Sequence, residues 1–186
     1  DAVVLGCGLG VHSQTAGFVQ QLTKHLEGPL LIDADGLNNI DEETLKERLG
    51  IAVITPHPRE LSRLSGQSVT EIQESRIATV RRLSQEWNVV LLLKGAFTVI
   101  GSPDARVFIN PTGNSALSTA GSGDVLSGFI GAFLAQGLSP LNATLTGAFL
   151  HGLAADCFVE QNDSSYMVAS DLFEGLRLAR NSIKLH

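Results

Sequence analysis

The sequence has little charge and few of the residues that mark specialised folds. Only 17% of its 186 residues are charged, against about a quarter in typical soluble domains. Its two cysteines are too few for a disulfide framework or a four-ligand zinc site. No apolar run approaches the roughly 20 residues that a membrane-spanning helix requires. Since 44% of the residues are hydrophobic, a disordered chain is also excluded, and we expect a reduced, cytoplasmic globular protein without a membrane segment.

The charge balance is acidic, because 13 Lys and Arg stand against 19 Asp and Glu for a net charge of −6. Binding to nucleic acid needs clustered cations that neutralise phosphates, so we expect no nucleic-acid partner. The length suits one domain, and residues 1–186 are predicted to form it. The sequence opens at Asp1 directly on an apolar run, and we therefore expect this domain to lack an N-terminal segment.

Short apolar runs alternate with longer helical patterns, as is typical of an α/β fold. Strands of a parallel sheet covered on both faces are apolar without polar alternation, and four runs fit that description: residues 2–5, 29–32, 51–54 and 89–93. A turn at residues 102–104 separates two further runs, 98–100 and 106–109, and predicts an antiparallel hairpin.

Helices are predicted at residues 70–87, 123–136, 141–159 and 170–180. In the first of them, Thr70 lies near the start and an apolar stripe follows. The stripe consists of Ile72, Ile77, Val80, Leu83 and Trp87. The expected architecture is a mainly parallel sheet with helices on both faces, followed by a C-terminal antiparallel hairpin and helices.

Ligands of such sheets bind beyond the carboxyl ends of the strands, so the loops after the strands are the candidate site. The first loop, residues 6–10, contains three glycines that would let a ligand approach the backbone. Val11 stands where a dinucleotide fingerprint needs its third glycine, so that match fails, and a bare turn is an equal alternative. After the second strand, Asp33 and Asp35 fit either a ribose contact or simple capping.

The third and fourth strands are followed by polar residues of a different kind. Two prolines bracket His57 and fix its backbone, and Glu60 falls in the first turn of the next helix. We interpret this segment as functional, although a proline-initiated helix with a capping glutamate would have the same sequence. Lys94 follows five apolar residues and is either a point charge suited to phosphate or a lysine reaching out to solvent.

The most informative segment runs from Asn110 to Gly128 and contains Gly121-Ser122-Gly123-Asp124 at the start of an apolar helix. Free N–H groups and the helix dipole at such a terminus form an anion site. Asp124 would stay ionised there and be available as a base. Capping alone would explain the aspartate but not the glycines around it.

Three further residues are expected to be structural. His151, among apolar neighbours, is predicted to be a buried histidine with its hydrogen bonds satisfied. Cys7 and Cys157 are predicted to be small buried hydrophobic side chains, because neither has a histidine partner nearby in the sequence.

Together these motifs resemble the nucleotide-dependent NAD(P)H-hydrate dehydratases of the ribokinase-like superfamily. The resemblance rests on residues 55–60, 94–96 and 110–128 in the family's order, and on the loop 6–10, where Cys7 replaces a more usual proline. It implies a ribokinase-like α/β fold and a metabolite-repair lyase. Such an enzyme converts NADHX or NADPHX back to NADH or NADPH, by phosphorylation of the hydrate hydroxyl and elimination of phosphate. ADP or ATP would be the co-substrate, with Mg²⁺, in a homo-oligomer that is commonly a tetramer.

The resemblance also implies roles for particular residues. Asp124 would take the hydroxyl proton, and the transferring phosphoryl group would be held by the N–H groups of Gly121, Ser122 and Gly123. The hydrate would contact Gly8, Gly10, His57 and Asp124. The nucleotide would lie against Lys94, Gly95, Ala96, Phe97 and Thr98, with Gly123 near its phosphates. Glu60 would reach Mg²⁺ through water, with Arg59 as an unusual extra charge beside it.

Three other functions stay open on the sequence alone. A small-molecule kinase of the same superfamily, acting on an alcohol such as a vitamin precursor, would use the same base and anion site. A catalytically silent nucleotide-binding module would have the motifs without turnover. A Rossmann dehydrogenase would explain residues 6–10 but would leave residues 121–124 without a role.

Overall fold

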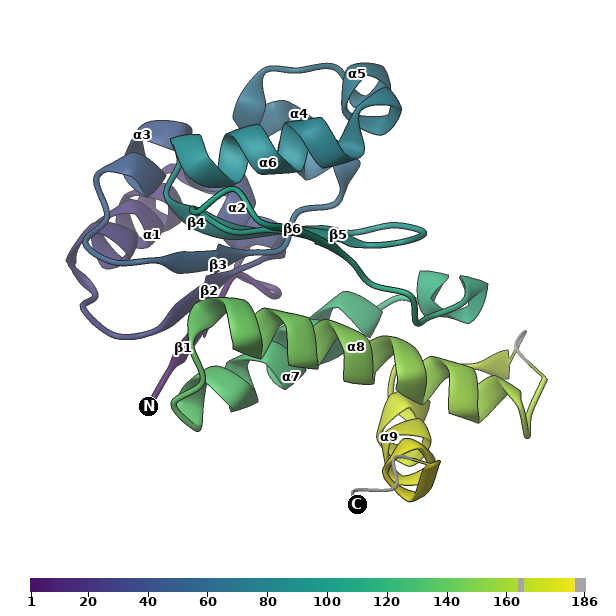
Figure 1. Ribbon diagram of the computed structural model, residues 1–186. Helices are drawn as coiled ribbons and strands as arrows, with labels where there is room; N and C mark the ends of the chain where they lie inside the picture. Colours follow the sequence, from purple (N-terminus) through teal and green to yellow (C-terminus); the bar gives the residue numbers. More distant parts are fainter. Residues whose placement is uncertain (164–165, 183–186) are drawn as a thin grey trace.

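The computed structural model describes residues 1–163 and 166–182 and has a sheet between two layers of helices (Figure 1). Within these residues the strands lie side by side in chain order: β1 (Val3–Leu5), β2 (Leu30–Ile32), β3 (Ala52–Ile54), β4 (Val89–Leu93), β5 (Val99–Gly101) and β6 (Val107–Ile109). The first four are parallel, and β5 and β6 are antiparallel to their neighbours. The predicted strands and hairpin are confirmed, with ends that differ by one residue at most.

Helices cover both faces of the sheet, as predicted. One layer contains α1 (Ser13–His25), α2 (Ala34–Asn38), α3 (Glu42–Lys46), α4 (Pro58–Ser65), α5 (Val69–Glu74) and α6 (Arg76–Glu86) (Figure 1). The other contains α7 (Ser122–Ala135) and α8 (Pro140–Val159), with the short 3₁₀ helix η1 (Ser115–Ser118) before them. Helix α9 (Asp171–Ser182) packs on α8. No helix of the described residues is both long and apolar enough to span a membrane.

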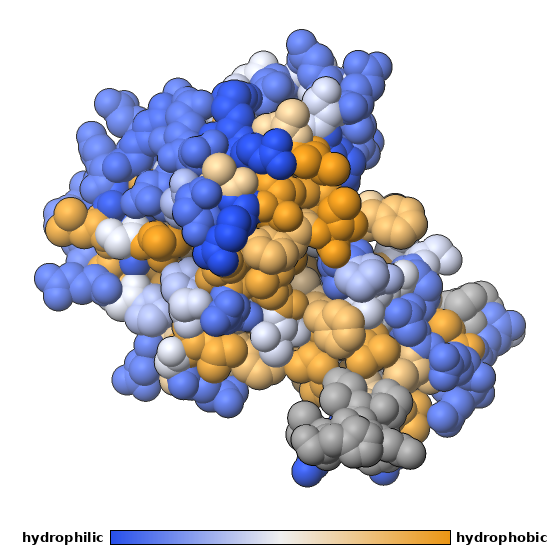
Figure 2. All heavy atoms as spheres, viewed as in Figure 1, coloured by the Kyte–Doolittle hydropathy of each residue, from blue (hydrophilic) through white to orange (hydrophobic). Residues whose placement is uncertain are grey.

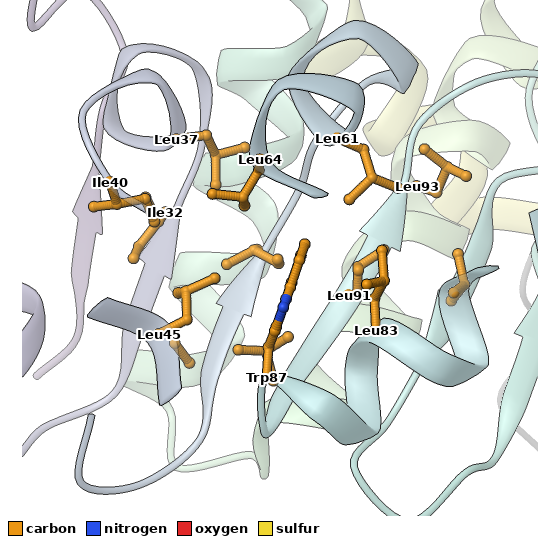
Figure 3. Packing of buried hydrophobic residues seen from close by; sticks show 14 of the residues in the cluster. Ile32, Leu37, Ile40, Leu45, Leu61, Leu64, Leu83, Trp87, Leu91 and Leu93 are labelled. Carbon is orange, nitrogen blue, oxygen red and sulfur yellow. The ribbon is translucent and has the colours of Figure 1, made fainter. Parts of the chain in front are cut away.

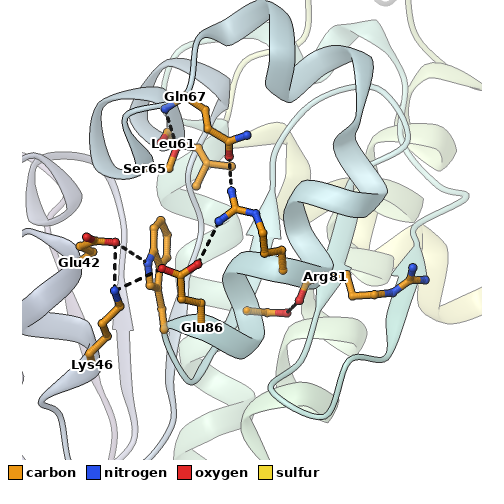
Figure 4. A network of polar contacts seen from close by, with 10 residues as sticks. Glu42, Lys46, Leu61, Ser65, Gln67, Arg81 and Glu86 are labelled. Atoms are coloured by element: carbon orange, nitrogen blue, oxygen red, sulfur yellow. Dashed lines mark hydrogen bonds and ion pairs between the residues drawn. The ribbon is translucent and has the colours of Figure 1, made fainter.

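Alternate residues of each central strand face opposite layers, which is why the strands are apolar throughout. On β4, Leu91 packs with the α1–α6 layer and Leu92 with the α7–α8 layer. The first core is centred on Trp87, which is fully buried among leucines of α2, α3, α4, α6 and β4 (Figure 3). Its ring N–H donates to Glu42 at 3.1 Å, within the polar network that Figure 4 shows at the rim of this core.

The single helix predicted at residues 70–87 is wrong, because two helices, α5 and α6, are separated there by Ser75 in a non-helical conformation (φ −132°, ψ 38°). The start also differs, since Ser68 rather than Thr70 caps α5 by accepting from the Glu71 N–H at 3.2 Å. After the break, Ile77 is 43% exposed and does not join the core stripe. The break places Arg76 at the start of α6, where its guanidinium donates to the Leu93 carbonyl at 3.1 Å.

Strand β6 forms one edge of the sheet, and Ile109 on it is 52% exposed. On the face shown in Figure 2, apolar side chains gather across the middle of the molecule, between the polar upper helices and the α8–α9 region. Elsewhere on this face the upper helices present mostly hydrophilic side chains (Figure 2).

The helices α7 and α8 approach each other closely at a glycine. A Cβ added to Gly147 would lie 2.6 Å from Cγ1 and 3.0 Å from the backbone nitrogen of Ile130. By contrast, a Cβ added to Gly128, on the exposed side of α7, would meet no atom within 4 Å. An added methyl group would therefore clash with a neighbour at Gly147 but not at Gly128.

We predict that Gly147→Ala lowers the free energy of unfolding by about 1–2 kcal/mol. The contact with the Ile130 backbone makes the overpacking cost about 2–3 kcal/mol, the upper part of its usual range, and the helix-propensity gain offsets about 1 kcal/mol of it. Gly128→Ala is the matched control and should raise the free energy of unfolding by about 0.5–1 kcal/mol. Urea denaturation followed by circular dichroism measures both. A Gly147→Ala protein as stable as the wild type would contradict the close packing.

Candidate functional site

The carboxylate of Asp33 joins three elements at the carboxyl edge of the sheet. Asp33 follows β2 and its side chain is 1% exposed, whereas Lys94 follows β4 and is 22% exposed. The Lys94 ammonium lies 2.7 Å from Asp33 Oδ1. The Ser127 hydroxyl of α7 donates to Asp33 Oδ2 at 2.8 Å. Asp33 makes no side-chain capping bond to α2, so the capping alternative does not describe its contacts.

Lys94 is therefore held as an ion pair at the start of α7 rather than free in solvent. A Cβ added to Gly123 would lie 3.8 Å from both Asp33 Oδ2 and the Lys94 ammonium, so the pair lies directly beside the Gly123 backbone. Glu60 Oε2 lies 3.8 Å from the same ammonium. Two carboxylates thus compensate a cation that also faces a cavity.

That cavity has a volume of about 460 Å³, within the usual range for small-molecule sites. It lies between the loop after β4, the loop after β6, the first turn of α7 and the middle of α8. It brings together the predicted nucleotide residues Lys94, Gly95, Ala96, Phe97, Thr98 and Gly123, and the wall also includes Asn110, Thr112, Ser122 and His151. Apolar lining from Leu117 and Leu126 accompanies these polar groups.

Phe97 stands out at this cavity because its backbone is left-handed (φ 52°) and its side chain is 74% exposed. A bulky residue in this conformation carries backbone strain, which is concentrated at functional sites in proteins. The Arg76 guanidinium packs against the loop at Gly95, where an added Cβ would lie 3.1 Å from it.

Asp124 lies in the exposed first turn of α7, near the cavity but outside its lining. Its carboxylate lies close to the Cys7 thiol of the glycine loop. Partial burial of the thiol and the neighbouring Asp124 carboxylate raise the pKa of Cys7 to about 12. The prediction that Cys7 is a buried hydrophobic side chain is wrong, since the residue is exposed and contacts Asp124, whereas Cys157 is buried as predicted.

The glycine loop is held against the second strand and α2. The Gly10 N–H donates to Asp35 Oδ2 at 2.8 Å, and Asn39 donates to the Gly10 carbonyl at 2.8 Å. Gly6 has φ +133°, and a Cβ there would lie 1.8 Å from the Asp33 carbonyl oxygen, so this position requires glycine. Asp35 therefore shapes the loop, since it accepts from the Gly10 N–H.

His57 and Glu60 form the capping box at the start of α4, behind Pro58. The Glu60 N–H donates to His57 Nδ1 at 3.1 Å, and the His57 N–H donates to Glu60 Oε2 at 2.7 Å. The capping alternative raised by the sequence is thus present in the structure. A site role is compatible with it, because His57 is 48% exposed while Glu60 points toward Lys94.

The fit of a metal ion can be judged from the donors. Among the residues that the structure describes, no three His, Cys, Asp or Glu side chains group so as to hold a metal. Mg²⁺ commonly keeps several waters and binds substrate phosphates with one or two protein carboxylates. Glu60 Oε2 already accepts a hydrogen bond from the His57 N–H. Glu60 therefore fits a contact through water to a Mg²⁺ ion that is bound to phosphate.

His151 is buried, and its Nε2 lies 2.9 Å from the Ser122 carbonyl. Burial lowers the pKa of His151 to about 4, so the ring is neutral at pH 7 and donates its Nε2–H to that carbonyl. The predicted buried, hydrogen-bonded histidine is confirmed. The sequence did not indicate that this residue borders the cavity.

Comparisons with known proteins identify the relatives of this chain. A family model described as NAD(P)H-hydrate dehydratase matches residues 1–177. The chain is 44% identical over 178 residues, or 95% of its length, to the bifunctional NAD(P)H-hydrate repair enzyme Nnr of Moorella thermoacetica, of which it covers 34%. It is 40% identical over 189 residues to the ADP-dependent (S)-NAD(P)H-hydrate dehydratase of Neisseria meningitidis, covering 98% of this chain and 64% of that protein.

Among solved structures, the ADP/ATP-dependent NAD(P)H-hydrate dehydratase of Bacillus subtilis, co-crystallised with ATP/Mg²⁺, aligns with a TM-score of 0.89 and 31% identity. The alignment covers 97% of this chain and 66% of that one. The predicted ribokinase-like fold class is confirmed. The chain spans between about a third and two thirds of the length of these relatives.

We predict that Asp33→Asn lowers the free energy of unfolding by about 3 kcal/mol, because it leaves the Lys94 charge without its closest partner. Glu47→Gln is the matched control, since it breaks the exposed Lys24–Glu47 pair and should leave stability unchanged. Chemical denaturation measures both. An Asp33→Asn protein of wild-type stability would contradict the structural role of this pair.

The raised pKa of Cys7 predicts slow alkylation by iodoacetamide at pH 8, where almost all of the thiol is protonated. The rate should keep rising about tenfold per pH unit through pH 10, whereas a thiol of ordinary pKa 9.0 levels off above pH 9. Asp124→Asn removes a nearby negative charge and should lower the Cys7 pKa and accelerate labelling at pH 8. Unchanged labelling in Asp124→Asn would show that the two groups do not interact.

Proposed function

The chain belongs to the NAD(P)H-hydrate dehydratase family, and we propose that it catalyses the nucleotide-dependent dehydration of NADHX or NADPHX to NADH or NADPH. The observation that carries this proposal is the meeting of a cavity of about 460 Å³ and the Asp124 carboxylate at the first turn of α7. A nucleotide on one side of that turn would face a hydrated nicotinamide on the other.

Dehydration needs a nucleotide because hydroxide is a poor leaving group and phosphate is a good one. In the proposed reaction the hydrate oxygen attacks the terminal phosphorus of ADP or ATP, and Asp124 takes the hydroxyl proton. The bond from phosphorus to the nucleotide breaks, releasing AMP or ADP. Phosphate then leaves the nicotinamide carbon and the neighbouring carbon loses a proton, which restores the ring double bond.

Most of the catalysis would come from positioning and charge, as in other phosphoryl transfers. The N–H groups of Gly121 and Gly123 would hold the transferring phosphoryl group at the positive end of α7. The Ser122 N–H donates to the Thr119 carbonyl at 3.4 Å and would have to exchange that bond to join them. Lys94 would add positive charge beside Gly123, where the Asp33 pair keeps it. This preorganised field would stabilise negative charge on the phosphoryl oxygens.

The remaining residues would bind the two substrates at separate positions. Lys94, Gly95, Ala96, Phe97 and Thr98 would bind the nucleotide, while Gly8, Gly10 and His57 would contact the hydrate beside Asp124. When bound, Mg²⁺ would neutralise phosphate charge. Its ligands would be nucleotide oxygens and water, with Glu60 reaching it through water.

Three expectations from the sequence stay predictions. They are a cytoplasmic location, assembly as a homo-oligomer such as a tetramer, and the organisation of residues 1–186 as one domain.

We predict that the protein, given NADH hydrate with ADP or ATP and Mg²⁺, restores the near-ultraviolet absorbance of reduced nicotinamide. Asp124→Asn should lower kcat by about 10²–10⁴-fold, the range expected for loss of a general base, without weakening nucleotide binding measured by calorimetry. Asp104→Asn, in the exposed turn between β5 and β6, is the matched control and should keep full activity.

These measurements test the dehydratase activity and the role of Asp124 as the base separately. No recovery of absorbance with either nucleotide would contradict the dehydratase proposal. A phosphorylated product that accumulates from an alcohol substrate would instead indicate a kinase. Recovery by the wild type and equally by Asp124→Asn would leave the dehydratase proposal standing and overturn the assignment of Asp124.

A further inference from the structure

The cavity has two facing walls, the first turn of α7 and the loop after β6. Helix α8 contacts both walls, although it contains none of the motifs that predicted the site. Helix α8 places His151 against the first turn of α7, where its Nε2 lies 2.9 Å from the Ser122 carbonyl. One turn further on, Asp156 accepts from the Gly113 N–H at 2.8 Å and from Asn114 Nδ2 at 2.9 Å. The two walls are otherwise joined by the Ser122 hydroxyl, which donates to the Leu117 carbonyl at 2.6 Å.

The loop after β6 lies directly on α8. A Cβ added to Gly152 would lie 2.3 Å from Thr112 Oγ1 and 2.7 Å from its carbonyl carbon, so glycine is required at this contact. The Thr112 hydroxyl donates to the Phe149 carbonyl at 2.9 Å, and Asn110 donates to the Ala148 carbonyl at 3.2 Å. The wall formed by residues 110–114 is thus fixed by hydrogen bonds to three positions of one helix.

The bond from His151 fixes a particular donor in the anion site. The Ser122 carbonyl and the Gly123 N–H belong to one planar peptide and point in opposite directions. Anchoring the carbonyl oxygen therefore aims the Gly123 N–H out of the helix terminus, where α7 has no intrahelical partner for it. The Ser122 N–H, by contrast, is turned toward the Thr119 carbonyl at 3.4 Å.

The environment of His151 suits a fixed donor rather than a proton carrier. The residue is 7% exposed, and the Phe129 ring packs edge-on against it at 6.0 Å between centroids. Because burial lowers its pKa to about 4, the imidazole remains neutral, and Nε2 is the nitrogen that holds the proton.

We propose that His151 is a positioning residue that aims the Gly123 amide at the transferring phosphoryl group, and that Asp156 positions the opposite wall for the nucleotide. The proposal rests on the proposed dehydratase function. Each residue acts through the backbone it holds, so the two should affect different kinetic constants. His151 should act on kcat through the transition state, and Asp156 on the KM for the nucleotide.

The test uses substitutions that separate the hydrogen bond from packing. His151→Phe keeps a ring beside Phe129 and removes the donor, whereas His151→Gln retains an N–H at the position of Nε2. We expect His151→Phe to lower kcat about 10- to 100-fold, as misplacement of a catalytic group does, with the KM for ADP within about twofold. His151→Gln should restore most of kcat. Asp156→Ala should raise the KM for ADP about tenfold through lost hydrogen bonds.

His25→Gln, on the exposed surface of α1, is the matched control and should leave both constants unchanged. The amide resonance of Gly123 in ¹⁵N-labelled protein gives a readout that needs no turnover, and it should shift in His151→Phe and return in His151→Gln. Calorimetric titration with inorganic phosphate should show weaker binding to His151→Phe.

A folded His151→Phe protein with wild-type kcat, or with an unshifted Gly123 resonance, would overturn the positioning role of His151. An unchanged KM in Asp156→Ala would overturn that of Asp156. If the wild type fails to dehydrate NADH hydrate, the proposed function fails alone, because the Gly123 resonance, phosphate binding and ADP binding still decide whether these residues order the anion site and the nucleotide wall.

Discussion

The ion pair between Asp33 and Lys94 is the interaction on which the rest of the site depends. It connects the carboxyl ends of β2 and β4, and through Ser127 it fixes the first turns of α7 to both strands. A buried carboxylate without a partner would be costly, so the pair favours the structure in which the strand ends and the helix terminus meet. The same contacts place a cation beside the Gly123 backbone, where the positive end of α7 already favours an anion.

This arrangement divides the site at the start of α7. The cavity lies on the side of Lys94 and α8, and the glycine loop lies on the side of Asp124, with the Cys7 thiol contacting that carboxylate. Phosphoryl transfer across one helix terminus needs such a division, because donor and acceptor must approach the same phosphorus from opposite directions. The hydrogen bonds from α8 would then keep the two walls of the cavity in a fixed relation.

The sequence predicted much of the fold because the strands are short apolar runs and the helices around them have clear periodicity. It failed at Ser75, where the chain leaves helical geometry and Arg76 then contacts the Leu93 carbonyl, a tertiary contact that apolar periodicity does not reveal. In the site, the sequence could predict that residues 94–98 and Gly123 lie together, because the loops after the strands of such a sheet meet at one edge. The roles of Asp33, His151 and Asp156 could not be predicted, because their partners are 61, 29 and 42–43 residues away. A buried acid after β2 and a lysine after β4, two parallel strands on either side of β3, were the one available signal for the ion pair.

The central claim is that the hydrate hydroxyl becomes part of a phosphate ester before it leaves, and an isotope measurement tests it most directly. NADH hydrate formed in H₂¹⁸O carries the label in its hydroxyl group. Turnover with unlabelled ADP or ATP in ordinary water should yield inorganic phosphate that contains one ¹⁸O atom for each NADH restored, measured by mass spectrometry. Label recovered in water, with none in phosphate, would contradict the account.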